Sequence, residues 1–165
     1  MFRKLSLVAA TLLAMAPAAK ADVLSISAMS FNLYDPSGNP RITATNGTLS
    51  PALASDLFAG VTFPKSGLVM CGFALVYQDS NGAENVKATL YRKRFLQGSD
   101  AEGAATPLAA VTSSGALGTM QRAKTTSVVG RTVDMVNYFY FVKISAQNFN
   151  TIPVGVQIEV KTACP

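Results

Sequence analysis

The sequence predicts an all-β fold: a single antiparallel β-sandwich, jelly-roll-like, with about eight or nine strands. Apolar residues recur with period two along most of the chain, and β-branched and aromatic residues are common among them. Clusters of Gly, Pro, Asn, Asp and Ser interrupt this alternation at intervals that suit short strands. No stretch after the N-terminal segment shows the period of an amphipathic helix. A closed barrel is the alternative that the same pattern allows.

The N-terminal segment, residues 1–21, has the three parts of a cleavable secretory signal. Arg3 and Lys4 precede an apolar run over 5–15, and Ala19-Lys20-Ala21 places small residues where signal peptidase needs them. The apolar run is too short for a transmembrane anchor, which needs roughly 20 residues. We therefore expect a secreted or periplasmic protein without a transmembrane anchor, in which residues 22–165 form one β-sandwich domain.

The first expected strand covers 23–34 and ends at 35–40, a turn rich in proline, glycine and short polar residues. A strand over 41–45 can pair back on it, and Asn46-Gly47 is typical of a tight turn. Residues 50–56 are expected to form one helical turn or a loop.

A strand over 58–63 follows, then a turn at 64–67 and the most apolar strand of the chain, over 68–77. Residues 79–83 have the composition of a hairpin turn, so 84–94 is expected to return as an alternating strand.

A polar, glycine-containing loop is expected over 97–106. Alternation then predicts the remaining strands over 107–112, 120–127, 136–144 and 154–161.

Several of these segments together resemble a known group. The residues concerned are Gly72-Phe73-x-Leu75-x-Tyr77-x-Asp79, Val86-x-Ala88-x-Leu90-Tyr91-Arg92, Val111-Thr112-Ser113-Ser114-Gly115-Ala116, Asn137-Tyr138-x-Tyr140-x-Val142 and Val154-Gly155-Val156-x-Ile158-Glu159-Val160. Over residues 56–161 the chain resembles a loose group of uncharacterised secreted bacterial β-sandwich proteins. The resemblance implies the fold and the exported location, and it implies no activity.

Charge and composition argue against several classes of function. Loss of residues 1–21 removes three basic side chains, which leaves 11 basic and 9 acidic groups, a balance of +2 (14 − 3 = 11). So small an excess predicts no nucleic-acid partner, and the basic run 92–94 is interpreted as a solvated strand end. The chain contains no histidine, the usual general base and the commonest metal ligand. We expect no catalytic residue, no metal and no cofactor.

The only two cysteines, Cys71 and Cys164, are predicted to form a disulfide, because an isolated pair in an oxidising compartment is normally bonded. This disulfide would attach the C-terminus to a central strand.

The positions of the acidic residues predict no site that contains two neighbouring carboxylates. Most of the nine fall in expected turns, and Glu159 alone lies within a strand. Asp79-x-Asn81-Gly82-x-Glu84 has oxygen ligands at alternate positions, but the hairpin turn already accounts for it. An enzyme would most plausibly be a carboxylate-dependent glycan-acting hydrolase, which needs two carboxylates within about 5–10 Å.

The aromatic run 138–141 suggests a binding surface. In a strand, Tyr138 and Tyr140 point to one side while Phe139 and Phe141 point to the other. The simplest interpretation buries the phenylalanines and leaves the tyrosines outside. The functional interpretation makes Tyr138 and Tyr140, with Tyr91, a stacking platform for sugar rings or for a partner protein.

The function predicted is a non-catalytic exported domain for binding or assembly at the cell envelope or outside the cell. Its partner would be a glycan or a protein, or further copies joined through open strand edges. The alternatives are the glycan-acting hydrolase and a purely structural envelope or matrix protein.

Overall fold

A computed structural model describes residues 22–33, 42–45, 48–51, 55–79, 85–95, 104–115, 118–146 and 151–165. The predicted export signal and the predicted turns at 35–40 and 46–47 lie outside these ranges. The same holds for nearly all of the turn at 79–83 and for most of the loop at 97–106.

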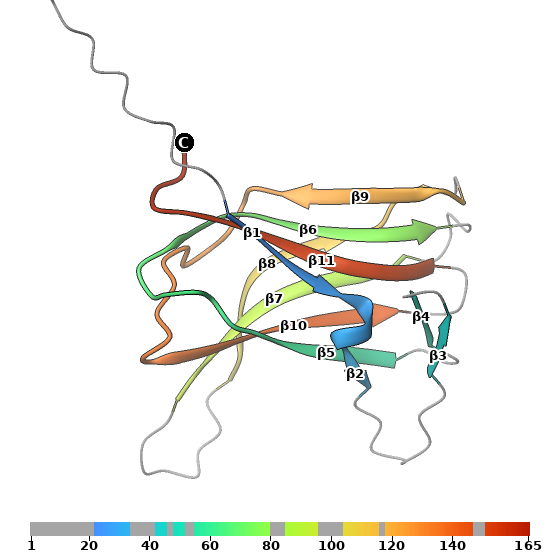
Figure 1. Cartoon of the computed structure of the whole chain (residues 1–165), viewed down its shortest axis with the longest axis horizontal. Coiled ribbons are helices and arrows are strands. Elements are labelled where there is room, and N and C mark those ends of the chain that lie inside the picture. The colour runs from blue at the N-terminus through green and yellow to red at the C-terminus, as the bar shows by residue number, and fades with distance from the viewer. Residues whose placement is uncertain are drawn as a thin grey trace, which may run out of the picture.

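Two antiparallel sheets pack face to face (Figure 1). The four-stranded sheet has the order β1 (Asp22–Ser27), β11 (Thr151–Lys161), β6 (Val69–Asp79) and β9 (Met120–Thr125). The five-stranded sheet has the order β2 (Asn32–Leu33), β5 (Ser55–Val61), β10 (Tyr138–Ala146), β7 (Lys87–Arg94) and β8 (Thr106–Thr112). A separate hairpin joins β3 (Ile42–Thr45) to β4 (Thr48–Pro51).

The pairing of the eight main strands is that of a jelly roll. With β2 and the β3–β4 hairpin set aside, the first strand pairs with the last (β1–β11) and the second with the last but one (β5–β10). The third pairs with the sixth (β6–β9), and the fourth with the fifth (β7–β8). Every connection between consecutive main strands crosses to the other sheet, except the one between β7 and β8. The predicted all-β, jelly-roll-like sandwich is confirmed, and the structure is not a closed barrel.

Three local predictions are wrong. The strand expected over 23–34 is divided between two sheets, because the 3-10 turn Ala28–Ser30 and buried Phe31 carry the chain into the core between β1 and β2. Strands β6 and β7 do not form a hairpin, because each has a strongly apolar face and the two lie in opposite sheets, facing one core. Residues 50–51 belong to β4 and residues 55–56 to β5, so these four residues form neither the helical turn nor the loop expected over 50–56; residues 52–54 lie outside the described residues.

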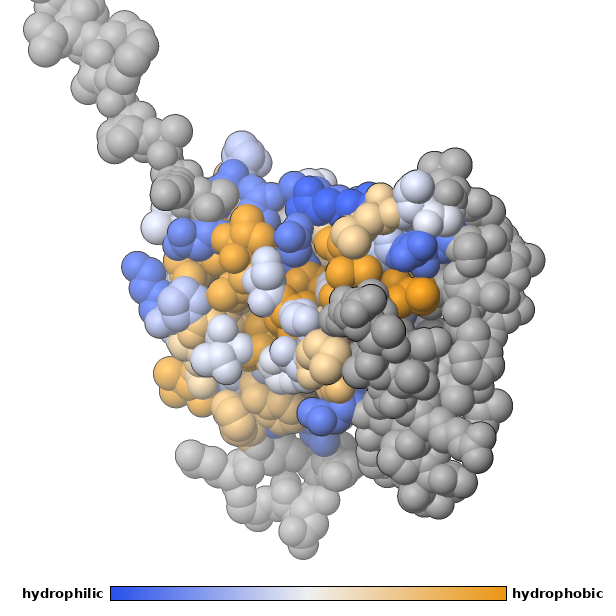
Figure 2. Space-filling model, turned by 45° about the vertical axis from the view of Figure 1, so that its right-hand side comes forward, coloured by the Kyte–Doolittle hydropathy of each residue, from blue (hydrophilic) through white to orange (hydrophobic). Residues whose placement is uncertain are grey.

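The core lies between the two sheets. Its largest fully buried side chains are Tyr77, Phe63, Phe73, Leu57, Met70, Leu75, Leu90, Ile144, Ile158, Val86, Val133 and Val142. They come from both sheets and from the segments that close the ends of the sandwich. On the face shown in Figure 2, hydrophilic residues line the top, over the four-stranded sheet, and hydrophobic residues gather below them.

Candidate functional site

The outer face of the five-stranded sheet carries a group of aromatic side chains, which we call the aromatic face: Phe58, Tyr91, Phe95, Phe139 and Phe141. Phe141 lies at its centre. Its ring centroid is 5.1 Å from that of Tyr91, with the two planes nearly parallel, and about 6 Å from those of Phe58 and Phe139. Phe95 extends the group, with its ring 5.5 Å from that of Phe139. Phe95 and Phe139 are 52% and 39% exposed, so the group reaches solvent.

Strand register explains why these rings meet. Phe141 pairs with Tyr91 across β10 and β7, and it pairs with Gly60 across β10 and β5. Directly opposed residues on one face of an antiparallel pair stand about 5 Å apart. Phe141 therefore has an aromatic ring on one side and a residue without a side chain on the other.

The missing side chain leaves a shallow, open hollow of about 470 Å³. Phe58, Phe139 and Phe141 provide its aromatic wall, and Asn32 and Lys93 provide polar groups. Apart from its two chain neighbours, no atom of the described residues would lie within 4 Å of a β-carbon at Gly60. Aromatic rings with a few polar groups in a hollow are the usual composition of a small-ligand site.

The tyrosines predicted to face outward do so only in part. Tyr91 lies on the aromatic face, but Tyr140 is 2% exposed in the core and Tyr138 packs half-buried against the core. The prediction that Tyr138 and Tyr140 point outward is therefore wrong. The hydroxyl of Tyr140 accepts a hydrogen bond of 2.8 Å from the Asp134 backbone N–H, which lets a phenol lie inside.

The outward phenylalanines could have been found from the sequence. Val142 and Ile144 share the phase of Tyr140 in β10, whereas Lys143 shares the phase of Phe139 and Phe141. A lysine is hardly ever fully buried unless it is paired, so the phase that contains Lys143 should have been placed outside. The short alternation of four aromatic residues concealed this signal.

An ion pair lies at one end of the aromatic face. Lys143 Nζ is 2.6 Å from Asp56 Oδ2 and 5.9 Å from the ring centroid of Phe58, and Ser145 Oγ donates a 2.7 Å hydrogen bond to Asp56 Oδ1. Burial raises the pKa of Asp56, but the hydrogen bonds from Lys143 and Ser145 and the positive charge of Lys143 together outweigh it and hold the pKa below its usual 3.8. Asp56 is therefore a charged partner of Lys143 at neutral pH.

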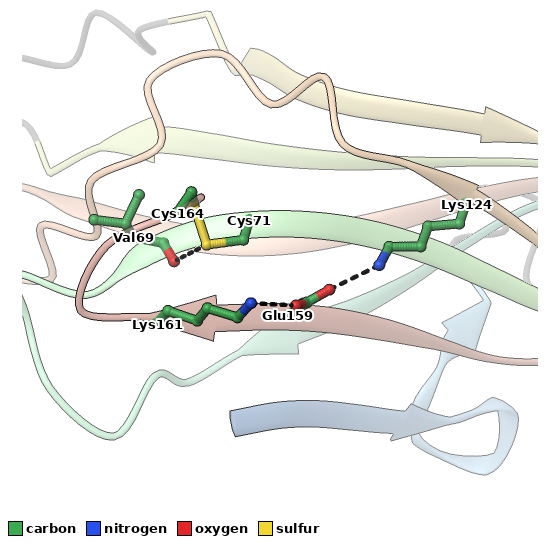
Figure 3. Close-up of polar contacts among 6 residues, drawn as sticks. All are labelled: Val69, Cys71, Lys124, Glu159, Lys161 and Cys164. Atoms are coloured by element: carbon green, nitrogen blue, oxygen red, sulfur yellow. Dashed lines mark hydrogen bonds and ion pairs between the residues drawn. A yellow bond between two sulfur atoms is a disulfide. The ribbon is translucent and has the colours of Figure 1, made fainter. Parts of the chain in front are cut away.

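The predicted disulfide between Cys71 and Cys164 is confirmed (Figure 3). Gly72 pairs with Glu159 and Met70 with Val160, so Cys71 is the extra residue of a β-bulge in β6. The bulge directs Cys71 to the C-terminal segment, where the two Cα atoms are 5.4 Å apart.

Beside the disulfide, Glu159 of β11 lies between two lysines (Figure 3). Lys124 Nζ and Lys161 Nζ are 2.8 Å and 3.1 Å from its carboxylate oxygens. Lys124 belongs to β9, so its side chain crosses β6 above Gly72, where a β-carbon would lie 2.9 Å from Lys124 Cε. The hydrogen bonds from Lys124 and then from Lys161 lower the pKa of Glu159. A hollow of about 310 Å³ adjoins this cluster.

The described carboxylates are spread over the molecule. Asp56 lies on the outer face of the five-stranded sheet and Glu159 beside the disulfide on the other sheet, while Asp79 is buried with Ser113 Oγ 3.0 Å from its carboxylate. Asp134 accepts hydrogen bonds from Asn137 in the segment before β10. Among the described residues no group of three or more His, Cys, Asp or Glu side chains could hold a metal ion, and no helix is long and apolar enough to span a membrane.

No protein-family model and no curated protein match this sequence. Among solved structures, the chain is similar to the C-terminal CBM6 of LamC, a marine laminarinase from Zobellia galactanivorans, at 14% identity and a TM-score of 0.49, over 83% of this chain and 98% of that one. It is also similar to a GH26-CBM35 β-(1,4)-mannanase of Podospora anserina (8% identity, TM-score 0.46) and to the CBM22-1–GH10 modules of a Clostridium thermocellum endo-1,4-β-D-xylanase (12%, 0.44). Each of these two similarities covers 87% of this chain and 28% of the other. Likenesses of this degree assign the chain to no family.

Proposed function

We propose that the protein is a non-catalytic exported domain that binds a glycan on its aromatic face. The observation that carries the proposal is the hollow above Gly60, which adjoins the central ring of Phe141. Sugar rings present C–H groups on their faces and hydroxyl groups around their edges. A ring in this hollow would place its C–H groups against Phe141, Phe139 and Phe58, and its hydroxyl groups within reach of Asn32 and Lys93.

The exposure of these rings supports a binding role. Large aromatic side chains gathered on one exposed sheet face are unusual in a monomeric soluble domain and mark interaction sites. Gly60 supports it further, because glycine inside a strand weakens the strand and often marks a close approach of another group. The disulfide supports export, since such bonds persist in oxidising compartments.

The decisive experiment fills the hollow while the fold is preserved. Gly60→Val adds a side chain whose β-carbon meets no atom within 4 Å, in an extended strand that favours valine. Ala110→Val is the matched control, because Ala110 is exposed on the same face but lies on β8, beyond β10 and β7. Phe141→Ala removes the central ring.

Binding of the purified protein to a panel of neutral and acidic oligosaccharides would be measured by calorimetry, with circular dichroism to check folding. We expect Gly60→Val and Phe141→Ala to weaken binding at least about tenfold, as for a central contact residue, and Ala110→Val to leave it unchanged. Unchanged affinity in a folded Gly60→Val variant would contradict the proposed site, and no binding to any member of the panel would contradict the function.

Assembly through a strand edge is the second candidate. Strand β1 is an edge strand with a continuous six-residue register, no proline and no lysine, and Val23 is 51% exposed. The edge strand β8, by contrast, contains Pro107 and a register shift, features that protect an edge. An increase in molecular mass with protein concentration that Val23→Lys abolishes would support assembly. A structural matrix protein would also require such assembly. A monomer at all concentrations would exclude it.

A further inference from the structure

The hollow beside the disulfide, on the four-stranded sheet, is lined by three cationic side chains. Lys124 belongs to β9, Lys161 to β11, and Arg131 to the segment between β9 and β10. Glu159 is the only acidic side chain among the described residues that line this hollow. A space of about 310 Å³ therefore brings together three positive charges and one negative charge from separate parts of the sequence.

Glu159 holds the two lysines in place but does not balance the charge of the hollow. One carboxylate oxygen lies 2.8 Å from Lys124 Nζ and the other lies 3.1 Å from Lys161 Nζ (Figure 3). An ammonium group has three N–H donors, so each lysine keeps donors that Glu159 does not use. Both ammonium groups are thus fixed at the hollow and can still bind a ligand there.

The guanidinium group of Arg131 is held by the backbone and has no acidic partner among the described residues. Nε donates a 3.1 Å hydrogen bond to the carbonyl oxygen of Val128, and Nη2 donates one of 3.3 Å to that of Thr126. Both acceptors are neutral, so the positive charge is positioned without being compensated. The planar guanidinium group is therefore oriented before a ligand arrives, which lowers the entropy cost of binding an anion.

We propose that this hollow binds a sulfate or phosphate monoester, whose oxygen atoms are held by Arg131, Lys124 and Lys161. The three cations exceed Glu159 by two positive charges, and a carboxylate on Pro165, which also lines the hollow, would leave an excess of one. A monoester of this kind carries about one to two negative charges, and its oxygens accept charge-assisted hydrogen bonds from several donors. The hollow has room for part of the carrier beside the disulfide and Pro165. The site lies on the sheet opposite the aromatic face and does not depend on glycan binding there.

The test uses the folded, disulfide-bonded protein and calorimetry at constant ionic strength, with chloride as the reference anion. The ligands are inorganic sulfate, inorganic phosphate, glucose 6-sulfate and glucose 6-phosphate, and vesicles with phosphatidic acid offer the same group on a lipid. Lys124→Gln and Arg131→Gln each remove one cation from the hollow. Arg122→Gln is the matched control, because Arg122 is exposed on the same strand as Lys124, two residues earlier, and does not line the hollow.

We expect at least one ester, on a sugar or on the vesicles, to bind more tightly than the inorganic ions, and the better carrier identifies the source of the group. Lys124→Gln and Arg131→Gln should each weaken that binding about tenfold, the size of one hydrogen bond to a charged group, and Arg122→Gln should leave it nearly unchanged. Circular dichroism checks that each variant folds. If Arg131→Gln unfolds because its loop loses two hydrogen bonds, Lys124→Gln decides, since Lys124 is exposed.

Three results would overturn the proposal: no binding beyond that of chloride, binding of the inorganic ions without either ester, or a loss in Lys124→Gln no larger than that in Arg122→Gln. The last result would show that the anion responds to the overall charge of β9 and not to the hollow.

Discussion

Removal of the disulfide is expected to destabilise this domain by about 4–5 kcal/mol. Cys71 and Cys164 are 93 residues apart in sequence, and the double variant Cys71→Ala/Cys164→Ala frees that loop in the unfolded chain. In the chain-entropy model a loop of this length contributes about 4.6 kcal/mol at 25 °C. Domains of this kind are stable by only about 5–15 kcal/mol in total, so the loss is a large fraction of the whole.

The loss would be measured by urea denaturation monitored by circular dichroism, from the midpoint and the slope of each transition. Wild-type protein treated with a reductant should lose about as much stability as the double variant, and the double variant should not respond to the reductant. A loss below about 1 kcal/mol would refute the reasoning, because it would show that the unfolded chain gains little freedom when the loop is opened.

Two other substitutions test the four-stranded sheet. In Gly155→Ala the new β-carbon would lie 2.5 Å from the backbone oxygen of Ile26, so β1 must move away from β11. We expect the free energy of unfolding to fall by about 1–3 kcal/mol and amide hydrogen exchange in β1 to become faster. Unchanged exchange in β1 would contradict the close approach of the two strands. Glu159 has a lowered pKa, so the stability it contributes is present above its usual 4.5 and is lost as pH falls through the lower folded value. Because its ion pairs are partly exposed, the contribution is about 0.5 kcal/mol, and Glu159→Gln should flatten the acid limb of the stability curve by that amount. An identical acid limb in the variant would assign the pH dependence to other groups.

Predictions from the sequence were confirmed where they rested on a local pattern or on a residue pair with no alternative. Period-two alternation predicted the sandwich because a strand with one buried face places every second side chain in the core. The pairing of Cys71 with Cys164 followed because no other cysteine exists. The jelly-roll order was predicted only as a class, since turn residues locate the ends of strands but do not say to which sheet each strand belongs. The assumed hairpin between β6 and β7 failed for that reason.

For the aromatic face, too, one part could be predicted from the sequence and another part could not. Alternation by itself determined that Tyr138 and Tyr140 point one way and Phe139 and Phe141 the other. Lys143, in the phase of the phenylalanines, indicates that this pair points outward, and the tertiary structure places Tyr140 in the core. The hollow depends on Gly60, which is far from β10 in sequence and meets it only through strand pairing. The sequence thus determined the strands, their two faces and the disulfide. The assembly of the candidate site was decided by long-range packing, because the cross-strand neighbours of each residue depend on where the other strands lie.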